Sequence, residues 1–217
     1  MSVSVGWVLE TLKQALARLA PRPASFHSRD DVERELELPV LATYSPRKEA
    51  VMSVNRIFLS PMSPVRSVLF CAPSGDEMTD VALRAAELLA VQSGQRVAFV
   101  EETDQRIATP ESPIHPLITH IDWRPVAVTV PRAERSTAAA SHGTNRVIGA
   151  TIEDLLPSFA FIIVNVTMPI ETLVPLARQV DGVVLVIAQG ETPKDSAKKL
   201  VAALNADARL IGAILTV

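Results

Sequence analysis

The sequence predicts an α/β protein with a mostly parallel sheet and helices on both faces, plus an N-terminal helical extension. Two observations lead to this fold class. From residue 66 onward, short and almost wholly apolar runs alternate with segments of helical pattern, which is the order of a parallel sheet with crossover helices. The chain also has 217 residues, 48% of them hydrophobic, so one full core can form.

Composition narrows the function classes. The net charge of −3 gives no overall basic field that would recruit nucleic acid. The single cysteine, Cys71, excludes an intramolecular disulfide framework and fits a reducing compartment. No apolar run approaches the roughly 18 residues of a membrane span, and the N-terminus lacks the pattern of a signal peptide. We expect a cytoplasmic protein whose only membrane contact is peripheral, at the inner face of the cytoplasmic membrane.

The first elements are helical. Residues 5–19 place apolar side chains on one helical stripe. We expect this helix to dock on its own domain. Trp7 and the basic residues leave open an alternative, in which the helix binds a partner or a membrane surface. Ser28 is a predicted cap for a short acidic helix over about 30–36. A brief extended run follows over 40–43.

We divide the chain at Pro46. Residues 1–46 form an N-terminal amphipathic helix and linker segment, and residues 47–217 form the α/β domain. A helical stretch over about 47–59 opens that domain.

The rest alternates between strands and helices. Residues 103–145 contain five prolines and show little regular pattern, and only 126–130 suggest a strand there. The segment that follows is a predicted helix that ends at Leu156. Thr192 is the expected cap of the last helix, with Pro193 in its first turn. The strongest predictions are strands over 66–72, 95–102, 160–166, 181–188 and 209–217, and helices over 78–94, 170–180 and 191–206.

Five segments in one order resemble a known family: "DDVERELELPVLATYSP", "RSVLFCAPSGDEMTDVALRAAELLAVQSGQRVAFVEE", "FAFIIVNVTMP", "VDGVVLVIAQGETPKDSAKKLVAAL" and "RLIGAILTV". Together they are similar to the cytoplasmic P-loop domain of the bacterial tyrosine kinases of exopolysaccharide and capsule export, relatives of the partitioning ATPases. The likeness spans about residues 28–217. It implies a P-loop NTPase-like three-layer sandwich.

The resemblance also implies a nucleotide site. Gly75 matches a glycine of the phosphate-binding loop, and Thr79 matches the hydroxyl that binds magnesium in the family. Glu101 matches the acidic residue that ends the second strand. Asn165 falls in the later strand motif, where the family has a metal-binding carboxylate.

Other positions depart from the family. Met78 stands at the position of the phosphate-binding lysine, and Glu77, preceded by Asp76, at that of a glycine. One like-charge pair near 4 Å costs on the order of 4 kcal/mol, or roughly three decades of affinity. Thr216 stands where an asparagine commonly meets the base. We therefore interpret the site as vestigial.

We expect no cofactor, with weak binding of ATP and magnesium as the alternative. The resemblance then indicates a non-catalytic accessory or regulatory protein of exopolysaccharide biosynthesis. Its expected partner is a membrane polysaccharide co-polymerase or an active kinase homologue, in a homo- or hetero-oligomer. The alternatives are a diverged ATP-binding tyrosine kinase and a partitioning-type ATPase.

The remaining chemistry-bearing residues have ordinary explanations. The histidines have no metal-ligand spacing to a carboxylate or to Cys71, so we expect them on the surface or in loops. Cys71 ends a predicted buried strand and is expected to be a core residue. The four histidines are His27, His115, His120 and His142.

Overall fold

The structure is a computed structural model that describes residues 24–45, 57–58, 65–73, 78–102, 115–123 and 152–217. The predicted helix over 5–19 and the predicted strand over 126–130 lie outside these residues. Of the predicted helix over 47–59, only residues 57 and 58 are described, and both are buried.

A seven-stranded sheet forms the centre of the molecule, in the order β1-β7-β6-β2-β5-β3-β4, and every pairing between its strands is parallel. This confirms the predicted fold class. The strands are β1 (Val40–Tyr44), β2 (Ser67–Cys71), β3 (Val97–Glu102), β4 (Ile118–Trp123), β5 (Phe161–Asn165), β6 (Gly182–Ala188) and β7 (Leu210–Thr216).

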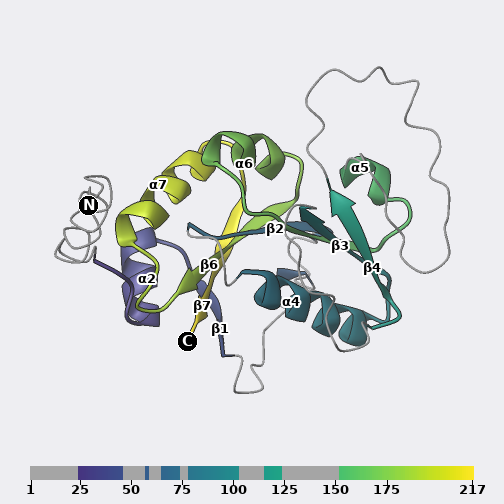
Figure 1. The fold of residues 1–217 in the computed structure, drawn as a ribbon, viewed down its shortest axis with the longest axis horizontal. Coiled ribbons are helices and arrows are strands. Elements are labelled where there is room, and N and C mark those ends of the chain that lie inside the picture. The colour runs from purple at the N-terminus through teal and green to yellow at the C-terminus, as the bar shows by residue number, and fades with distance from the viewer. Residues whose placement is uncertain (1–23, 46–56, 59–64, 74–77, 103–114, 124–151) are drawn as a thin grey trace, which may run out of the picture.

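Helices cover both faces of the sheet, as Figure 1 shows: α6 and α7 lie above it in this view and α4 lies below. Helix α4 packs against β2, β3, β4 and β5, whereas α2 packs against α7 and β1. The described helices are α2 (Arg29–Leu36), α4 (Met78–Ser93), α5 (Ile152–Leu155), α6 (Ile170–Ala177) and α7 (Lys194–Asn205).

Helix α4 shows how the sequence builds this packing. Its buried stripe consists largely of small side chains, which let a helix lie close to a sheet. Gly94 follows the helix with φ +64 and ends it, as predicted, because that left-handed conformation suits glycine. The fully buried residues of the stripe are Val81, Ala82, Ala85, Ala86, Leu89 and Ala90.

The segment before residue 46 is joined to this sheet. Ser28 caps α2, as predicted, because its hydroxyl accepts a hydrogen bond from the amide of Asp31 at 3.2 Å. Strand β1 then pairs with β7 along the edge of the sheet. A Cβ at Gly212 would lie 2.5 Å from the carbonyl oxygen of Pro39, so only glycine allows β1 to approach this closely.

Two local predictions were wrong. Strand β4 was not predicted, because Pro116 and Pro125 surround it and masked its β-branched pattern. Thr192 does not cap α7: the N-cap is Pro193 and no side chain bonds to the helix amides there. The Thr192 hydroxyl accepts a hydrogen bond from the amide of Ala188 instead, at 2.9 Å, and so closes the turn after β6.

Candidate functional site

The candidate site lies at the carboxyl ends of the central strands. In an open parallel sheet the carboxyl ends of all strands meet at one edge, and ligands of α/β proteins bind there. Asn165 ends β5, with Phe70 of β2 as its register partner on one side and Glu101 of β3 on the other. Two of the four predicted site residues, Glu101 and Asn165, are therefore neighbours. Helix α4, which follows β2, begins at Met78 next to this edge.

The four predicted residues differ in how far the structure places them. Asn165 is buried, with 4% of its surface exposed. The side chain of Glu101 is 18% exposed, and its Oε1 is buried without a hydrogen-bond partner. Gly75 and the side chain of Thr79 lie outside the described part of the chain, although Thr79 belongs to the first turn of α4.

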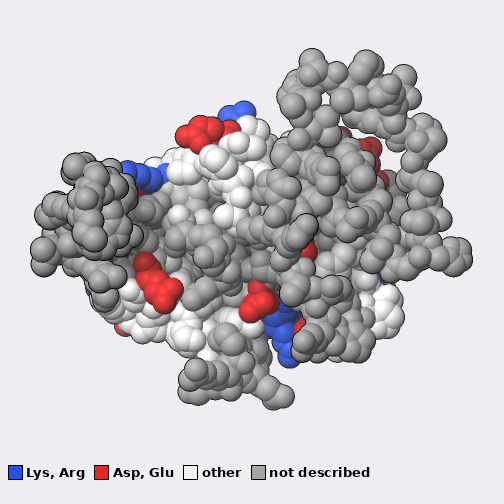
Figure 2. Space-filling view, viewed as in Figure 1, with Lys and Arg blue, Asp and Glu red and all other residues white. Residues whose placement is uncertain are grey.

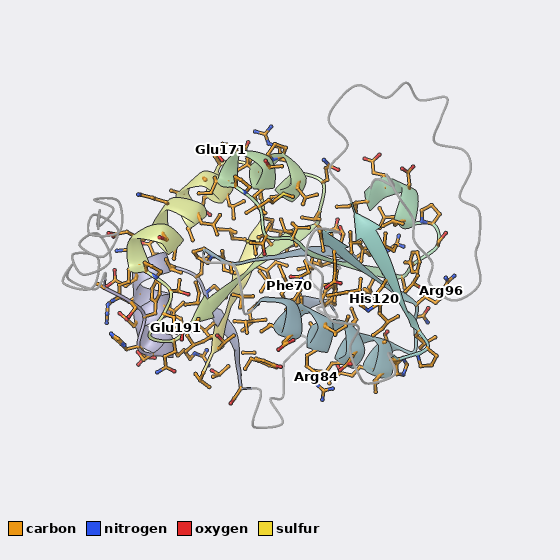
Figure 3. All side chains as sticks on the ribbon, viewed as in Figure 1. Phe70, Arg84, Arg96, His120, Glu171 and Glu191 are labelled. Carbon is orange, nitrogen blue, oxygen red and sulfur yellow. The ribbon has the colours of Figure 1, made fainter. Side chains whose placement is uncertain are left out.

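A third residue, which the sequence did not indicate, joins this group. His120 of β4 places its Nδ1 3.6 Å from Oε2 of Glu101, and its ring meets Phe99 edge-on at a centroid distance of 5.1 Å. In Figure 3, Phe70 is labelled above one end of α4 and His120 toward the other end. The expectation of a surface or loop histidine was wrong for His120, because it belongs to the strand that was not predicted. The run Ile118–Trp123 contains the β-branched residues that could have revealed it.

Two other residues at this edge are buried in the core of the protein. Thr216 is 5% exposed, and its hydroxyl donates to the carbonyl oxygen of Ile187 at 3.5 Å. Cys71 is a core residue, as predicted, and burial raises the pKa of its thiol to about 12. A thiol with that pKa stays protonated at neutral pH and is inert as a nucleophile.

Residues 24–28, which we call the strap, lie over the turn between β6 and α7. The amide of Gly190 donates to the carbonyl oxygen of Phe26 at 2.7 Å, and the amide of Lys194 donates to that of Ala24 at 2.9 Å. The strap therefore supplies an acceptor to the first amide of α7, which has no side-chain cap. The Phe26 side chain is fully buried.

An ion cluster fixes α2 beside the start of α7. Lys194 Nζ lies 2.7 Å from Oδ1 of Asp31, and Lys198 Nζ lies 2.6 Å from Oε2 of Glu35. The hydrogen bond between Asp31 and Lys194 lowers the pKa of the carboxyl and raises the pKa of the ammonium. The cluster and the strap together tie the N-terminal segment to the carboxyl-end edge of the sheet.

The described site side chains at this edge are one carboxylate and one amide. Magnesium in such complexes is held by carboxylates and phosphate oxygens, and here Glu101 faces an imidazole while Asn165 supplies only a neutral amide. Within the described ranges, no group of three or more His, Cys, Asp and Glu side chains could hold a metal ion.

The charges on the described surface are mixed. On the face drawn in Figure 2, acidic and basic side chains form small separate groups among uncharged ones. In the part of the chain that the structure describes, no helix is both long and apolar enough to cross a membrane.

The fold defines the class of the protein. An all-parallel sheet in this strand order, with α4 following β2 and helices on both faces, is a P-loop NTPase-like α/β sandwich. Comparison with known proteins supports this class at the level of structure alone. No protein-family model matches the sequence, and no curated protein matches it significantly.

The solved structures that share the fold include three tyrosine-kinase-related chains. The chimerical protein CapA2B2 has a TM-score of 0.58 and 19% identity, over 87% of this chain and 98% of its own. The BceF tyrosine kinase domain has a TM-score of 0.57 and 15% identity, over 89% and 99% of the two chains. The kinase domain of the Escherichia coli tyrosine kinase ETK has a TM-score of 0.52 and 15% identity, over 84% and 92%. The predicted resemblance to bacterial tyrosine kinase domains is thus confirmed for the fold.

Proposed function

We propose that this chain is a non-catalytic relative of the exopolysaccharide and capsule tyrosine kinases, which keeps their fold as an interaction module. The observation that carries the proposal is the chemistry of the edge where the nucleotide would bind. A buried neutral amide, Asn165, stands beside the only described carboxylate of the predicted site, and that carboxylate contacts His120.

The sequence adds two further reasons. Met78 cannot neutralise phosphate charge, and Glu77 adds like charge where the family has glycine. Both changes disfavour a bound triphosphate. The described strands and helices around the site nevertheless share one buried core, so the scaffold is retained.

The proposed role is regulatory or accessory, through protein–protein contact at the inner face of the membrane. The proposed partner is a membrane polysaccharide co-polymerase or an active kinase homologue, and a homo- or hetero-oligomer is the expected form. Genes for glycosyltransferases beside this one would support the assignment to polysaccharide export over a partitioning-type role.

Calorimetric titration with Mg-ATP tests the proposal. We expect no heat of binding, or binding only in the millimolar range, in the wild-type chain and equally in Thr79→Ala. Micromolar binding that Thr79→Ala abolishes would refute the proposal. That result would favour the second candidate, a diverged ATP-binding kinase or ATPase.

One observation favours that second candidate. Glu101 Oε1 is buried without a hydrogen-bond partner, and such an atom is costly unless a ligand or an ion reaches it. Glu101→Gln separates the two functions, because it would weaken Mg-ATP binding in the diverged enzyme and leave an interaction module unchanged toward its protein partner.

A further inference from the structure

We propose that Tyr44, the last residue of β1, is a phosphorylation site for an active tyrosine kinase that shares the fold of this chain. The inference rests on the proposed function, because a kinase homologue is a partner there, and it names a reaction between the two proteins. Tyr44 is the only tyrosine in the sequence. A kinase that is specific for tyrosine therefore has one acceptor in this chain.

The first argument is the position of Tyr44 in the sheet. Strand β1 lies at one end of the strand order and, among the described strands, pairs only with β7. The Tyr44 ring packs partly against the core, and the residue keeps some exposure. An extended segment at the edge of a sheet is a form in which one protein recognises another by strand addition. The acceptor therefore lies at the rim of the sheet and not inside it.

The second argument concerns the hydroxyl group. A tyrosine hydroxyl that is kept for packing normally has a hydrogen-bond partner. Among the described residues, no group makes a hydrogen bond to the Tyr44 hydroxyl. The ring alone accounts for the packing, and phenylalanine would supply the same ring. The hydroxyl is therefore available for a role outside the fold.

The chemistry of that role is transfer of one phosphoryl group. Burial raises the pKa of the Tyr44 hydroxyl, and the charge of Asp80 raises it further, so the phenol keeps its proton at neutral pH. The Tyr44 oxygen attacks the γ-phosphorus of Mg-ATP held by the partner kinase, and the bond from that phosphorus to the bridging oxygen breaks. ADP leaves, and the phenolic proton passes to a base of the partner.

The third argument is the charge around the ring, which gives the modification a consequence. The charged groups that act on Tyr44 are Asp80, Arg84 and Glu87, all on α4. Arg84 already pairs with Glu87 at 2.9 Å. A phosphate adds a charge of about −1.5 to −2, and Asp80 repels it. Phosphorylation would therefore loosen the end of β1.

The end of β1 is where the N-terminal segment meets the last strand. The amide of Val217 donates to the carbonyl oxygen of Tyr44 at 2.9 Å, and Thr216 is the register partner of Tyr44. A phosphate on Tyr44 acts on this joint directly. The modification would thus regulate how firmly β1 is held on β7.

The test incubates the full chain with Mg-ATP and, in separate reactions, the BceF and ETK tyrosine kinase domains. Intact-mass spectrometry and peptide mapping count and locate the phosphoryl groups. We expect one group on Tyr44 in the wild-type chain and no phosphotyrosine in Tyr44→Phe, which keeps the ring and lacks the acceptor oxygen. A wild-type chain without phosphotyrosine after both reactions would overturn the proposal and leave the proposed function standing. Phosphotyrosine formed without added kinase would refute the proposed function instead.

Hydrogen exchange of the phosphorylated full chain tests the consequence. We expect the amides of β1 and of Val217 to exchange several-fold faster than in the unmodified chain, and Asp80→Asn to reduce this difference. Asp30→Asn is the matched control, because Asp30 is an exposed carboxylate on α2 that does not act on Tyr44, and it should leave the difference unchanged. Equal exchange in the phosphorylated and unmodified chains would overturn the regulatory role.

Discussion

Restoring the missing carboxylate by Asn165→Asp should destabilise the free protein and make its stability depend on a divalent cation. Asn165 and Glu101 are register partners on adjacent strands, and such strands lie about 4.8 Å apart. Two carboxylates about 5 Å apart repel by about 3 kcal/mol at the effective dielectric of a protein. Asn165 is 4% exposed, so water cannot screen the pair well. We therefore expect a loss of about 3 kcal/mol in the free energy of unfolding.

Urea denaturation in EDTA, and again in excess MgCl₂ or MnCl₂, measures this effect. The cation should recover most of the loss, because it neutralises both carboxylates. At low pH the introduced carboxyl is protonated and the repulsion is absent, so the penalty should grow as the pH rises and both carboxyls ionise. Asn205→Asp, an exposed site at the end of α7, is the matched control and should change the stability little.

A variant Asn165→Asp that is as stable as the wild-type chain in EDTA would refute the reasoning. So would a loss that no divalent cation reverses, because the two carboxylates would then not share a site.

Three further predictions concern activity and the packing of the ends of the sheet. Glu77→Gly with Met78→Lys should give no measurable ATP turnover in a coupled assay, because Asn165 still under-coordinates the metal; turnover in that double variant would contradict this. Burial acts to raise the pKa of Asp181, but the amides and hydroxyl of Arg66 and Ser67 hold it below its usual range. Stability from Asp181 should be present above about pH 4 and be lost as the pH falls through its folded pKa, and Asp181→Asn should remove that part of the pH dependence in urea denaturation. Phe26→Ala should lower the free energy of unfolding by about 3–5 kcal/mol because it empties a fully buried site; a loss below about 1 kcal/mol would show that the strap is not part of the cooperative fold.

The parallel sheet could be predicted because its central strands read as continuous apolar runs. Strand β2 is buried along its whole length, and β6 nearly so, a pattern that strands covered on both faces produce. The helix start at Ser28 and the helix end at Gly94 followed from local chemistry, and the structure has both.

The parts that could not be predicted depend on contacts between distant segments. Strand β4 alternates weakly and, among the described strands, pairs only with β3, so the prolines near it outweighed its signal. Thr192 has the side chain of a cap, but its hydroxyl bonds back to Ala188, because the strap already occupies the start of α7.

The candidate site, too, could be predicted from the sequence only in part. The resemblance to the kinase family assigned Glu101 and Asn165 to one site, and the register of β3 with β5 places them side by side. His120 could not be added without β4, since only the register of β3 with β4 places its ring against Glu101. Gly75 and Thr79 stay predictions, because the described side chains do not include them.

The pairing of β1 with β7 has a consequence for how the chain is assembled. Ala213 donates its amide to Pro39 and Val217 donates its amide to Tyr44, each at 2.9 Å, so an early segment completes the last strand. During synthesis α2 and β1 are made long before β7, so β1 has no strand to pair with until β7 has left the ribosome. A separately produced peptide of residues 24–45 should therefore reassociate with a chain that lacks them, as the missing outer strand of a nearly finished sheet.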